Sequence, residues 1–366
     1  MSEVNLTPAS AAEVDKNMVA GAPDAAGLVW YSVKEAPFEI YGLYEPAADG
    51  DFRRMPDDVA AATNNGVKRN ARHTAGGRVR FSTNSRRVAI RVRMPYVTRY
   101  AHMPLTGSAS FDLYTDTPTG SCFAAVFKPT VDITDGFELT HTFAKAQERF
   151  LTLNFPLYSP VSSLEIGLDA GSSLGAGKKY TGTRLPVVFY GSSITQGACA
   201  SRPGLSYQSM ISRRLDIDFI NLGFSGNARA ELPIVEYMAA LPMSAFVSDY
   251  DHNAPNVDYL RETHCRMYRM IREKNPDIPY IMLSRPDYTT HSEADSSARR
   301  RVVEDTFRYA REQGDKSVWY IDGEGIFRGP EEDACTTDGS HPNDLGFMKM
   351  ADSLGRILRR AMRRNI

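Results

Sequence analysis

The sequence of 366 residues lacks the cysteine patterns that mark several specialised classes of protein. It has only four cysteines, which are far apart in the chain: Cys122, Cys199, Cys265 and Cys335. They include no Cys-x-x-Cys pair, which argues against a zinc ribbon or a thioredoxin-like site. A disulfide framework is not expected either, because a chain of this length can bury a large core without cross-links. We therefore predict reduced thiols in a cytosol.

The sequence also lacks an excess of positive or negative charge, and it has no long apolar runs. Its 43 basic and 44 acidic residues give a formal net charge of −1, which argues against a dedicated nucleic-acid binder and against steering toward a charged membrane. No stretch approaches 18 uncharged apolar residues, so no transmembrane helix is expected. The first residues show no basic segment followed by an apolar run, so we predict no signal peptide and a cytoplasmic location, although a trimmed secreted protein would look the same.

The composition is that of a globular protein, because 42% of the residues are apolar and 24% are charged. At about 150 residues per domain, the length favours two domains. The pattern of the chain changes near residue 184. We predict an N-terminal arm over residues 1–26, one domain over residues 27–183 and a second domain over residues 184–366.

The first domain is predicted to be all β, because short alternating apolar runs are separated by turn-forming residues. In residues 88–94, for example, apolar side chains alternate with Arg91 and Arg93, as in a strand with one buried face. Such strands favour an antiparallel sandwich that resembles a jelly roll, and residues 171–177 suit a linker. The predicted strands are residues 28–33, 78–82, 88–94, 108–115, 122–128, 137–143, 150–155 and 162–168.

The second domain alternates strands with helices, which is typical of a parallel sheet covered on both sides. The predicted strands are residues 185–190, 218–222, 245–248, 280–284 and 318–321. The predicted helices are residues 206–215, 232–240, 257–274, 298–313 and 346–362. Ligands of such folds bind beyond the carboxyl ends of the strands, so the residues after each strand are the candidates for a site.

Four short segments follow these strands. Gly191-Ser192-Ser193 follows the first strand, but no lysine lies between Lys179 and Lys274, so a phosphate-binding loop of the Walker type is not supported. The segment also lacks the Gly-x-Ser-x-Gly form of an esterase elbow. A turn with Gly226 follows the second strand, Asp-Tyr-Asp-His-Asn ends at residue 253, and Asp-Gly-Ser-His ends at residue 341. Each segment alone could be an ordinary turn.

In this order, the four segments together resemble the GDSL/SGNH hydrolase superfamily. The resemblance extends into the first domain, where Ser-Phe-Asp-Leu-Tyr at residues 110–114, with residues 53–56 and 81–85 upstream, looks like a sandwich domain named for a Gly-x-Asp-Leu-Tyr motif. The resemblance therefore covers nearly all of the chain after residue 26. It implies that the second domain is a three-layer, flavodoxin-like α/β fold with a five-stranded parallel sheet.

The resemblance also implies roles for individual residues. Ser193 would be the nucleophile, His341 the base and Asp338 the carboxylate that orients it. The oxyanion hole would consist of the backbone N–H groups of Ser193 and Gly226 and the side-chain amide of Asn253. A serine hydroxyl needs such a base, and donors preorganised around the developing oxyanion stabilise the transition state. This site needs no metal and no cofactor, and we predict neither.

Some positions leave alternatives open. Ser192 replaces the aspartate that usually precedes the nucleophile, so the two serines could be confused. His252 could contact the substrate or form a loop hydrogen bond. Cys199 is a candidate nucleophile only if Ser193 is dispensable. His102 and the other histidines outside the motifs show no metal-ligand spacing.

The resemblance implies hydrolysis of short-chain acyl esters, with O-acetyl groups on carbohydrate as the leading substrate class. The expected partner is a small-molecule or oligosaccharide ester. No nucleic acid and no membrane is expected as a partner, and assembly into a homo-oligomer is an open alternative. Two alternatives remain: a carbohydrate-binding or scaffolding protein with a vestigial hydrolase site, and an acyltransferase that uses the same triad.

Overall fold

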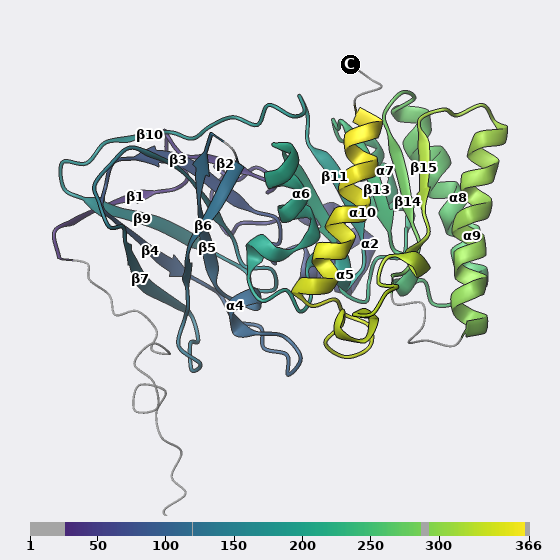
Figure 1. Cartoon of the computed structure of the whole chain (residues 1–366), viewed down its shortest axis with the longest axis horizontal. Coiled ribbons are helices and arrows are strands. Elements are labelled where there is room, and N and C mark those ends of the chain that lie inside the picture. The colour runs from purple at the N-terminus through teal and green to yellow at the C-terminus, as the bar shows by residue number, and fades with distance from the viewer. Residues whose placement is uncertain (1–25, 119, 287–292, 363–366) are drawn as a thin grey trace, which may run out of the picture.

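Two halves of different architecture lie side by side in the computed structural model of the protein (Figure 1). The structure describes residues 26–118, 120–286 and 293–362, so the predicted arm lies almost entirely outside the described residues. The N-terminal half is an antiparallel β-sandwich, and the C-terminal half is a parallel sheet with helices on both faces. The predicted fold class is confirmed.

The sandwich consists of two antiparallel sheets that enclose an apolar core. In the order of pairing, the four-stranded sheet contains β1 (Leu28–Ser32), β9 (Ser163–Asp169), β4 (Arg87–Arg93) and β7 (Gly136–Thr142). The six-stranded sheet contains β10 (Leu174–Ala176), β3 (Arg78–Thr83), β8 (Arg149–Asn154), β5 (Phe111–Thr117) and β6 (Gly120–Phe127), with β2 (Glu39–Tyr41) also paired to β3. The alternation in β4 predicts one buried face, and Val88, Ile90 and Val92 are indeed buried.

Two strands of the sandwich, β2 and β10, were not predicted from the sequence. The prediction that residues 171–177 form a linker is wrong for Leu174–Ala176, which pair with β3. The hydroxyl of Thr83 donates to the carbonyl of Ser173, which holds this short edge strand on the sheet. Both strands have only three residues, too few for an alternating pattern to show.

The C-terminal half contains a five-stranded sheet in which every pair of strands is parallel. Its order of pairing is β12 (Phe219–Gly223), β11 (Val187–Gly191), β13 (Ala245–Asp249), β14 (Tyr280–Leu283) and β15 (Val318–Ile321). Renumbered within this half, the order is 2-1-3-4-5, which is that of flavodoxin-like folds. All residues of β11 and β13 are buried, as expected for central strands covered on both faces.

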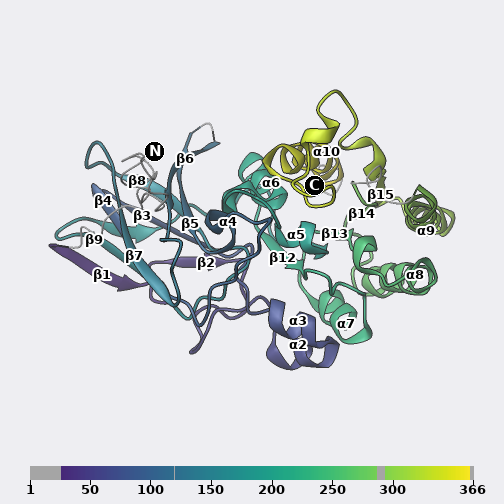
Figure 2. The ribbon, with the colours of Figure 1, turned by 90° about the horizontal axis from the view of Figure 1, so that it is seen from below.

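Helices cover both faces of this sheet (Figure 2). On one face lie α6 (Tyr207–Leu215) and α10 (Asp344–Met362), and on the other lie α7 (Leu232–Ala240), α8 (Val257–Lys274) and α9 (Glu293–Glu312). The short α5 (Ser193–Gln196) follows β11, and α4 (Leu105–Ser108) lies in the N-terminal half. None of the helices in the described part of the chain combines the length and the apolar character needed to cross a membrane.

A segment of the N-terminal half belongs to the core of the C-terminal half. The helices α2 (Asp57–Thr63) and α3 (Asn65–Asn70) lie beside α7 (Figure 2). Met55 and Val67 are fully buried in the same apolar cluster as Ile234 of α7. Neither helix was predicted from the sequence, because both are too short to show helical periodicity.

The Asp-Leu-Tyr motif of β5 joins the two halves. Asp112 is fully buried and accepts hydrogen bonds from the side chains of Asn154 (2.8 Å) and Arg202 (2.9 Å) and from the backbone N–H of Gly204 (2.9 Å). Burial raises the pKa of the Asp112 carboxyl, although these donors oppose the shift. A Cβ atom on Gly204 would lie 2.5 Å from the ring of Tyr114, so the junction requires glycine there. The motif thus docks the sandwich next to the segment that follows α5.

Candidate active site

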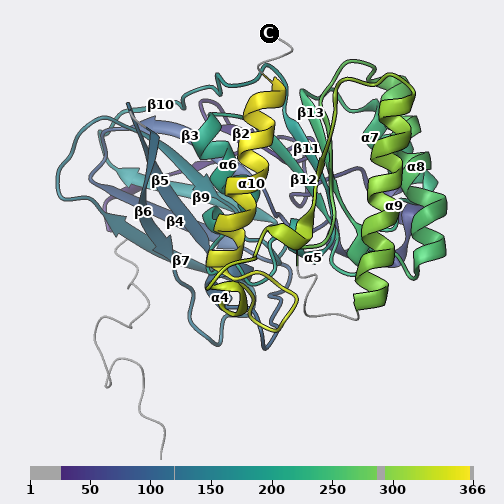
Figure 3. The same ribbon diagram turned by 45° about the vertical axis from the view of Figure 1, so that its right-hand side comes forward.

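The turn after β11 places the short helix α5 at the carboxyl end of the parallel sheet (Figure 3), and Ser193 is the first residue of this helix. Ser192 caps α5, because its hydroxyl accepts a hydrogen bond from the N–H of Ile194 (3.2 Å). Ser192 is fully buried, whereas Ser193 keeps 8% of its surface exposed. The two adjacent serines therefore differ in role. Ser192 caps the N-terminus of α5, and Ser193 faces the candidate site.

Three of the predicted residues form one line of hydrogen bonds. The Oγ atom of Ser193 lies 2.9 Å from Nε2 of His341, and Nδ1 of the same ring lies 2.8 Å from Oδ2 of Asp338. The serine comes from the turn after β11, while the other two come from the loop that precedes α10. The structure therefore brings together a hydroxyl, an imidazole and a carboxylate in the geometry of a serine triad.

The proton positions follow from the Asp338 carboxylate. Partial burial by itself would raise the pKa of Asp338, but hydrogen bonds from the backbone and ring of His341 and from the N–H of Ser340 lower it to about 2. The group is thus ionised near neutral pH and can only accept. In the neutral ring of His341, Nδ1 therefore carries the proton, which leaves Nε2 as an acceptor for the hydroxyl of Ser193.

The loop around Asp338 is organised locally. Its Oδ1 atom accepts from the backbone N–H groups of Ser340 (3.1 Å) and His341 (2.8 Å), and the N–H of Thr337 donates to the carbonyl of His341 (2.9 Å). Gly339 has a φ of +86°, which few other residues adopt. The sequence spacing of Asp338 and His341 therefore already determines their contact.

Gly226 lies in the turn after β12, which approaches α5 closely. It has a φ of +69°, and a Cβ atom there would meet no heavy atom within 4 Å. Next to it, the N–H of Ser225 donates to Oε1 of Gln196 in α5 (3.0 Å). A Cβ on Gly223 would lie 2.2 Å from the nitrogen of Gln196, so glycine permits this approach. The turn thus sits against the helix of Ser193, while the oxyanion role of Gly226 stays a prediction.

Asn253 ends a 3₁₀ turn after β13 and contacts the same loop as Gly226. Its Oδ1 atom accepts a hydrogen bond from the backbone N–H of Ala228 (3.2 Å). Because a backbone N–H can only donate, this contact identifies the oxygen end of the amide and turns the NH₂ group away from Ala228. Arg299 of α9 supports the turn from behind, since it donates to the carbonyls of Asp251 and Ala254.

Two other candidates from the sequence lie near these elements. Nδ1 of His252 is 3.4 Å from the guanidinium of Arg285, so the loop contact considered for it is present, and substrate contact stays a prediction. Cys199 is 6% exposed, and burial raises the pKa of its thiol to about 11. A thiol that is protonated near neutral pH is a poor nucleophile, which favours Ser193 over Cys199.

The N-terminal half makes contacts with α5 that were not predicted from the sequence. The hydroxyl of Tyr158 donates to the carbonyl of Ser193 (3.1 Å), and the side-chain amide of Gln196 donates to Nδ1 of His73 (3.0 Å) and to the carbonyl of Leu157 (3.2 Å). Burial, together with the charges of Arg54 and Arg69, lowers the pKa of His73 to about 3, so its ring is neutral and can accept. The helix that carries the candidate nucleophile is thus held from the sandwich side.

Arg54 supports β12 in the same way. It is fully buried, and its guanidinium donates to the backbone carbonyls of Asn221 (2.9 Å) and Gly223 (2.7 Å) in β12 and of Asn70 (2.6 Å) and His73 (2.9 Å) in the N-terminal half. Burial lowers its pKa to about 9, which still leaves it charged near neutral pH. The guanidinium of Arg54 therefore donates hydrogen bonds to four backbone carbonyls where β12 meets the N-terminal half.

Comparison with protein families finds a match for each half of the chain. Residues 184–359 match the GDSL-like lipase/acylhydrolase family, and residues 28–174 match the family described as the GxDLY N-terminus of the SGNH-hydrolase type of esterase. No curated protein matches the sequence. The two matches together cover both domains and agree with the resemblance expected from the motifs.

Several solved structures are similar to this chain over most of its length. A protein from Bacteroides ovatus assigned as a GDSL-like lipase is 26% identical, with a TM-score of 0.81 over 92% of this chain and 98% of that one. The salicylyl-acyltransferase SsfX3 from a tetracycline biosynthetic pathway is 21% identical, with a TM-score of 0.75 over 91% and 97%. The acetyl xylan esterase Est2A from Butyrivibrio proteoclasticus is 14% identical, with a TM-score of 0.56 over 92% and 98%. The last two show a shared fold.

Proposed function

Because residues 184–359 belong to the GDSL-like lipase/acylhydrolase family, we propose that this protein is a serine ester hydrolase that cleaves short-chain acyl esters. The observation that carries the proposal is the line of hydrogen bonds from Ser193 through His341 to Asp338. It supplies an activated nucleophile at the carboxyl end of a parallel sheet, where such folds bind their ligands.

In the proposed mechanism, Oγ of Ser193 attacks the acyl carbonyl while Nε2 of His341 takes the hydroxyl proton. Asp338 stabilises the imidazolium that forms. The N–H groups of Ser193 and Gly226 and the amide of Asn253 stabilise the oxyanion, each worth on the order of 3 kcal/mol. His341 then protonates the leaving alcohol oxygen. It next activates a water molecule that hydrolyses the acyl-enzyme and frees Ser193.

We propose an O-acetylated carbohydrate as the substrate. The support is the shared fold with an acetyl xylan esterase, which extends over 92% of this chain and so includes the sandwich as well as the α/β domain. The near-zero net charge agrees with a neutral ester substrate. Hydrolysis of the ester would release acetate and leave a free sugar hydroxyl.

An acyltransferase is a second candidate, and a specific observation favours it. The salicylyl-acyltransferase has the higher TM-score of the two distant relatives, 0.75 against 0.56. The same acyl-enzyme would then pass its acyl group to an alcohol acceptor in place of water. Product analysis with and without a sugar acceptor separates the two activities, because only a transferase forms a new ester.

The experiment that tests the proposal is an ester panel that spans acyl chain length and includes acetylated oligosaccharides. Ser193→Ala should fold and lose turnover of short-chain esters. Ser192→Ala is the matched control, because it removes only a helix cap, worth about 1 kcal/mol of stability, and should retain turnover. Full turnover by Ser193→Ala would refute the mechanism. Binding of acetylated oligosaccharides without turnover by the wild type would indicate a carbohydrate-binding protein with a vestigial site.

A further inference from the structure

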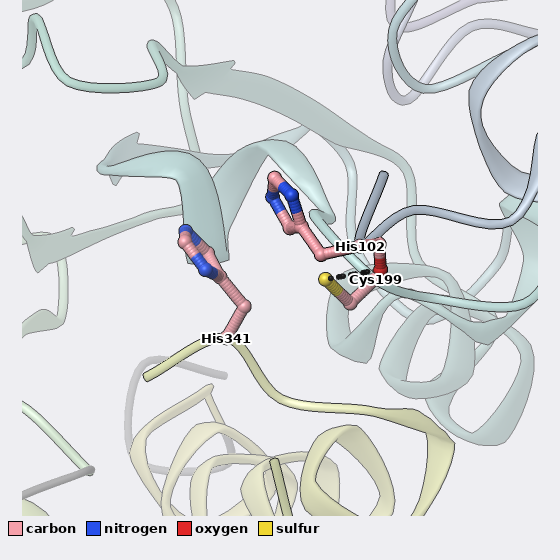
Figure 4. A group of neighbouring side chains, drawn as sticks. All are labelled: His102, Cys199 and His341. Atoms are coloured by element: carbon pink, nitrogen blue, oxygen red, sulfur yellow. Dashed lines mark hydrogen bonds between the residues drawn. The ribbon is translucent and has the colours of Figure 1, made fainter. Parts of the chain in front are cut away.

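Three side chains that can bind a metal ion meet beside the candidate nucleophile: His102, Cys199 and His341 (Figure 4). They come from three separate segments. His102 lies in the loop between β4 and α4, Cys199 follows α5, and His341 lies in the loop before α10. One nitrogen or sulfur atom from each lies within 4.8 Å of the other two. The proposed mechanism uses only one of the three side chains.

The arrangement of the three side chains is compact. The rings of His102 and His341 are tilted by 33°, with centroids 5.3 Å apart, and the sulfur of Cys199 is turned toward the side where both rings lie (Figure 4). Cys199 is held in place, because its thiol donates to the carbonyl of His102 (3.3 Å). Its φ of +68° is unusual for a residue other than glycine. Cys199 is also a free thiol that takes part in no disulfide.

Two imidazole nitrogens and one sulfur form the donor set of zinc and of cations like it, whereas magnesium and calcium prefer oxygen. Zinc bonds of about 2.0–2.3 Å place neighbouring ligand atoms about 3.5 Å apart in a tetrahedral site. The upper bound of 4.8 Å on the separations here exceeds that spacing by about 1.3 Å, a difference that rotation of the two rings on binding would close. A water molecule or Oγ of Ser193, which already lies 2.9 Å from Nε2 of His341, is placed to be the fourth ligand.

We propose that His102, Cys199 and His341 form an inhibitory binding site for a divalent cation of the zinc class. On binding, the thiol of Cys199 releases its proton to solvent and its sulfur donates an electron pair to the cation. Nε2 of His341 donates its lone pair to the cation and gives up the hydrogen bond from Ser193. Nδ1 of His341 stays hydrogen-bonded to Asp338, as metal-bound histidines commonly are with a carboxylate.

Inhibition follows because the cation and the reaction need the same lone pair. The proposed mechanism requires Nε2 of His341 to accept the proton of Ser193, and a coordinated nitrogen cannot do so. The protein without the cation is then the active form. The inhibition rests on the proposed esterase function, whereas the binding of the cation does not.

The binding test uses the full chain, freed of metal and titrated with cobalt(II) and with zinc. Cobalt(II) should bind with one equivalent and give the charge-transfer absorption of a thiolate ligand. Cys199→Ala should lose that absorption. In zinc calorimetry, Cys199→Ala, Cys199→Ser and His102→Gln should each bind at least about tenfold more weakly than the wild type. Circular dichroism checks that each variant folds.

The matched controls are Cys122→Ala and His141→Gln, an exposed cysteine on β6 and a histidine on β7, which should bind cobalt(II) and zinc as the wild type does. The proposal is wrong if cobalt(II) gives no thiolate band, or if Cys199→Ala and Cys122→Ala bind zinc equally.

Activity gives a second readout, the ratio of ester turnover with and without one equivalent of zinc. Zinc should abolish turnover in the wild type and in Cys122→Ala, and a chelator should restore it. Cys199→Ser and His102→Gln should need at least about tenfold more zinc for the same inhibition. Zinc binding by a wild type that hydrolyses no ester would refute the proposed function and leave the site intact. Turnover that one equivalent of zinc leaves unchanged would refute the inhibitory site and leave the function intact.

Discussion

Tyr158 of the N-terminal half donates a hydrogen bond of 3.1 Å to the backbone carbonyl of Ser193, the candidate nucleophile of the C-terminal half. Tyr158 is 1% exposed, so the contact is shielded from solvent. The same carbonyl also accepts from the N–H groups of Gly197 and Ala198, both at 3.0 Å. The sandwich therefore directly supports the turn that carries the candidate nucleophile.

Tyr158→Phe should remove this support while keeping the shape of the side chain. Because the carbonyl of Ser193 keeps two other donors, we expect the free energy of unfolding to fall by only about 1 kcal/mol. Ester turnover should fall through kcat more than through KM, since the change acts on the position of the nucleophile. Tyr309→Phe on α9 is the control and should match the wild type in kcat. Equal kcat values for both variants would contradict the supporting role.

Asp112→Asn should destabilise the junction of the two halves. The carboxylate of Asp112 accepts hydrogen bonds from Asn154, Arg202 and Gly204. The NH₂ group of an asparagine at this position would face at least one of these donors and could not accept from it. We expect a loss of about 3 kcal/mol in the free energy of unfolding, as for other broken buried ion pairs. Glu138→Gln, which breaks the more exposed pair with Arg91, should cost less than about 1 kcal/mol. Chemical denaturation of the two variants measures the difference, and similar losses would contradict the prediction.

Asn253→Asp separates the hydrogen bond that this side chain accepts from the one that it is predicted to donate to the oxyanion. Aspartate keeps an acceptor for the N–H of Ala228, but it removes the donor predicted to face the oxyanion. The expected result is a fall in kcat of about 10²–10³-fold with a small change in KM. The control is Asn256→Asp, which should be neutral because aspartate caps α8 as well as asparagine does. Steady-state kinetics that show the same kcat for both variants would remove Asn253 from the oxyanion hole.

His73 should make the stability of the protein depend on pH. Burial and the charges of Arg54 and Arg69 lower its folded-state pKa from 6.5 to about 3, so the unfolded chain binds a proton that the folded protein excludes. The stability from neutral His73 is fully present above about pH 6.5, and it is lost by about 1.4 kcal/mol per pH unit as the pH falls toward 3. His73→Gln should show a shallower decline between pH 6.5 and pH 4. Parallel unfolding curves for the two proteins would count against this account.

The sequence by itself determined the features that depend on local pattern. Near-continuous apolar runs placed the five parallel strands within a few residues. Short apolar runs between turn-forming residues located eight of the ten strands in the described part of the sandwich. The contact between Asp338 and His341 was also predictable, because three residues of a tight turn bring the carboxylate to the ring. The order of motifs at the strand ends carries the resemblance to GDSL/SGNH hydrolases, and that resemblance predicts Ser193 as the nucleophile.

Only the tertiary structure decided which distant residues meet. Ser193 and His341 are 148 positions apart, and their contact depends on how the strands of one sheet are ordered. The contacts of Tyr158, Arg54 and His73 cross between the halves, and no periodicity records them, because side-chain pairing at an interface depends on packing in three dimensions. The same holds for His102 and Cys199: no spacing between them is typical of metal ligands, yet the fold brings both to His341.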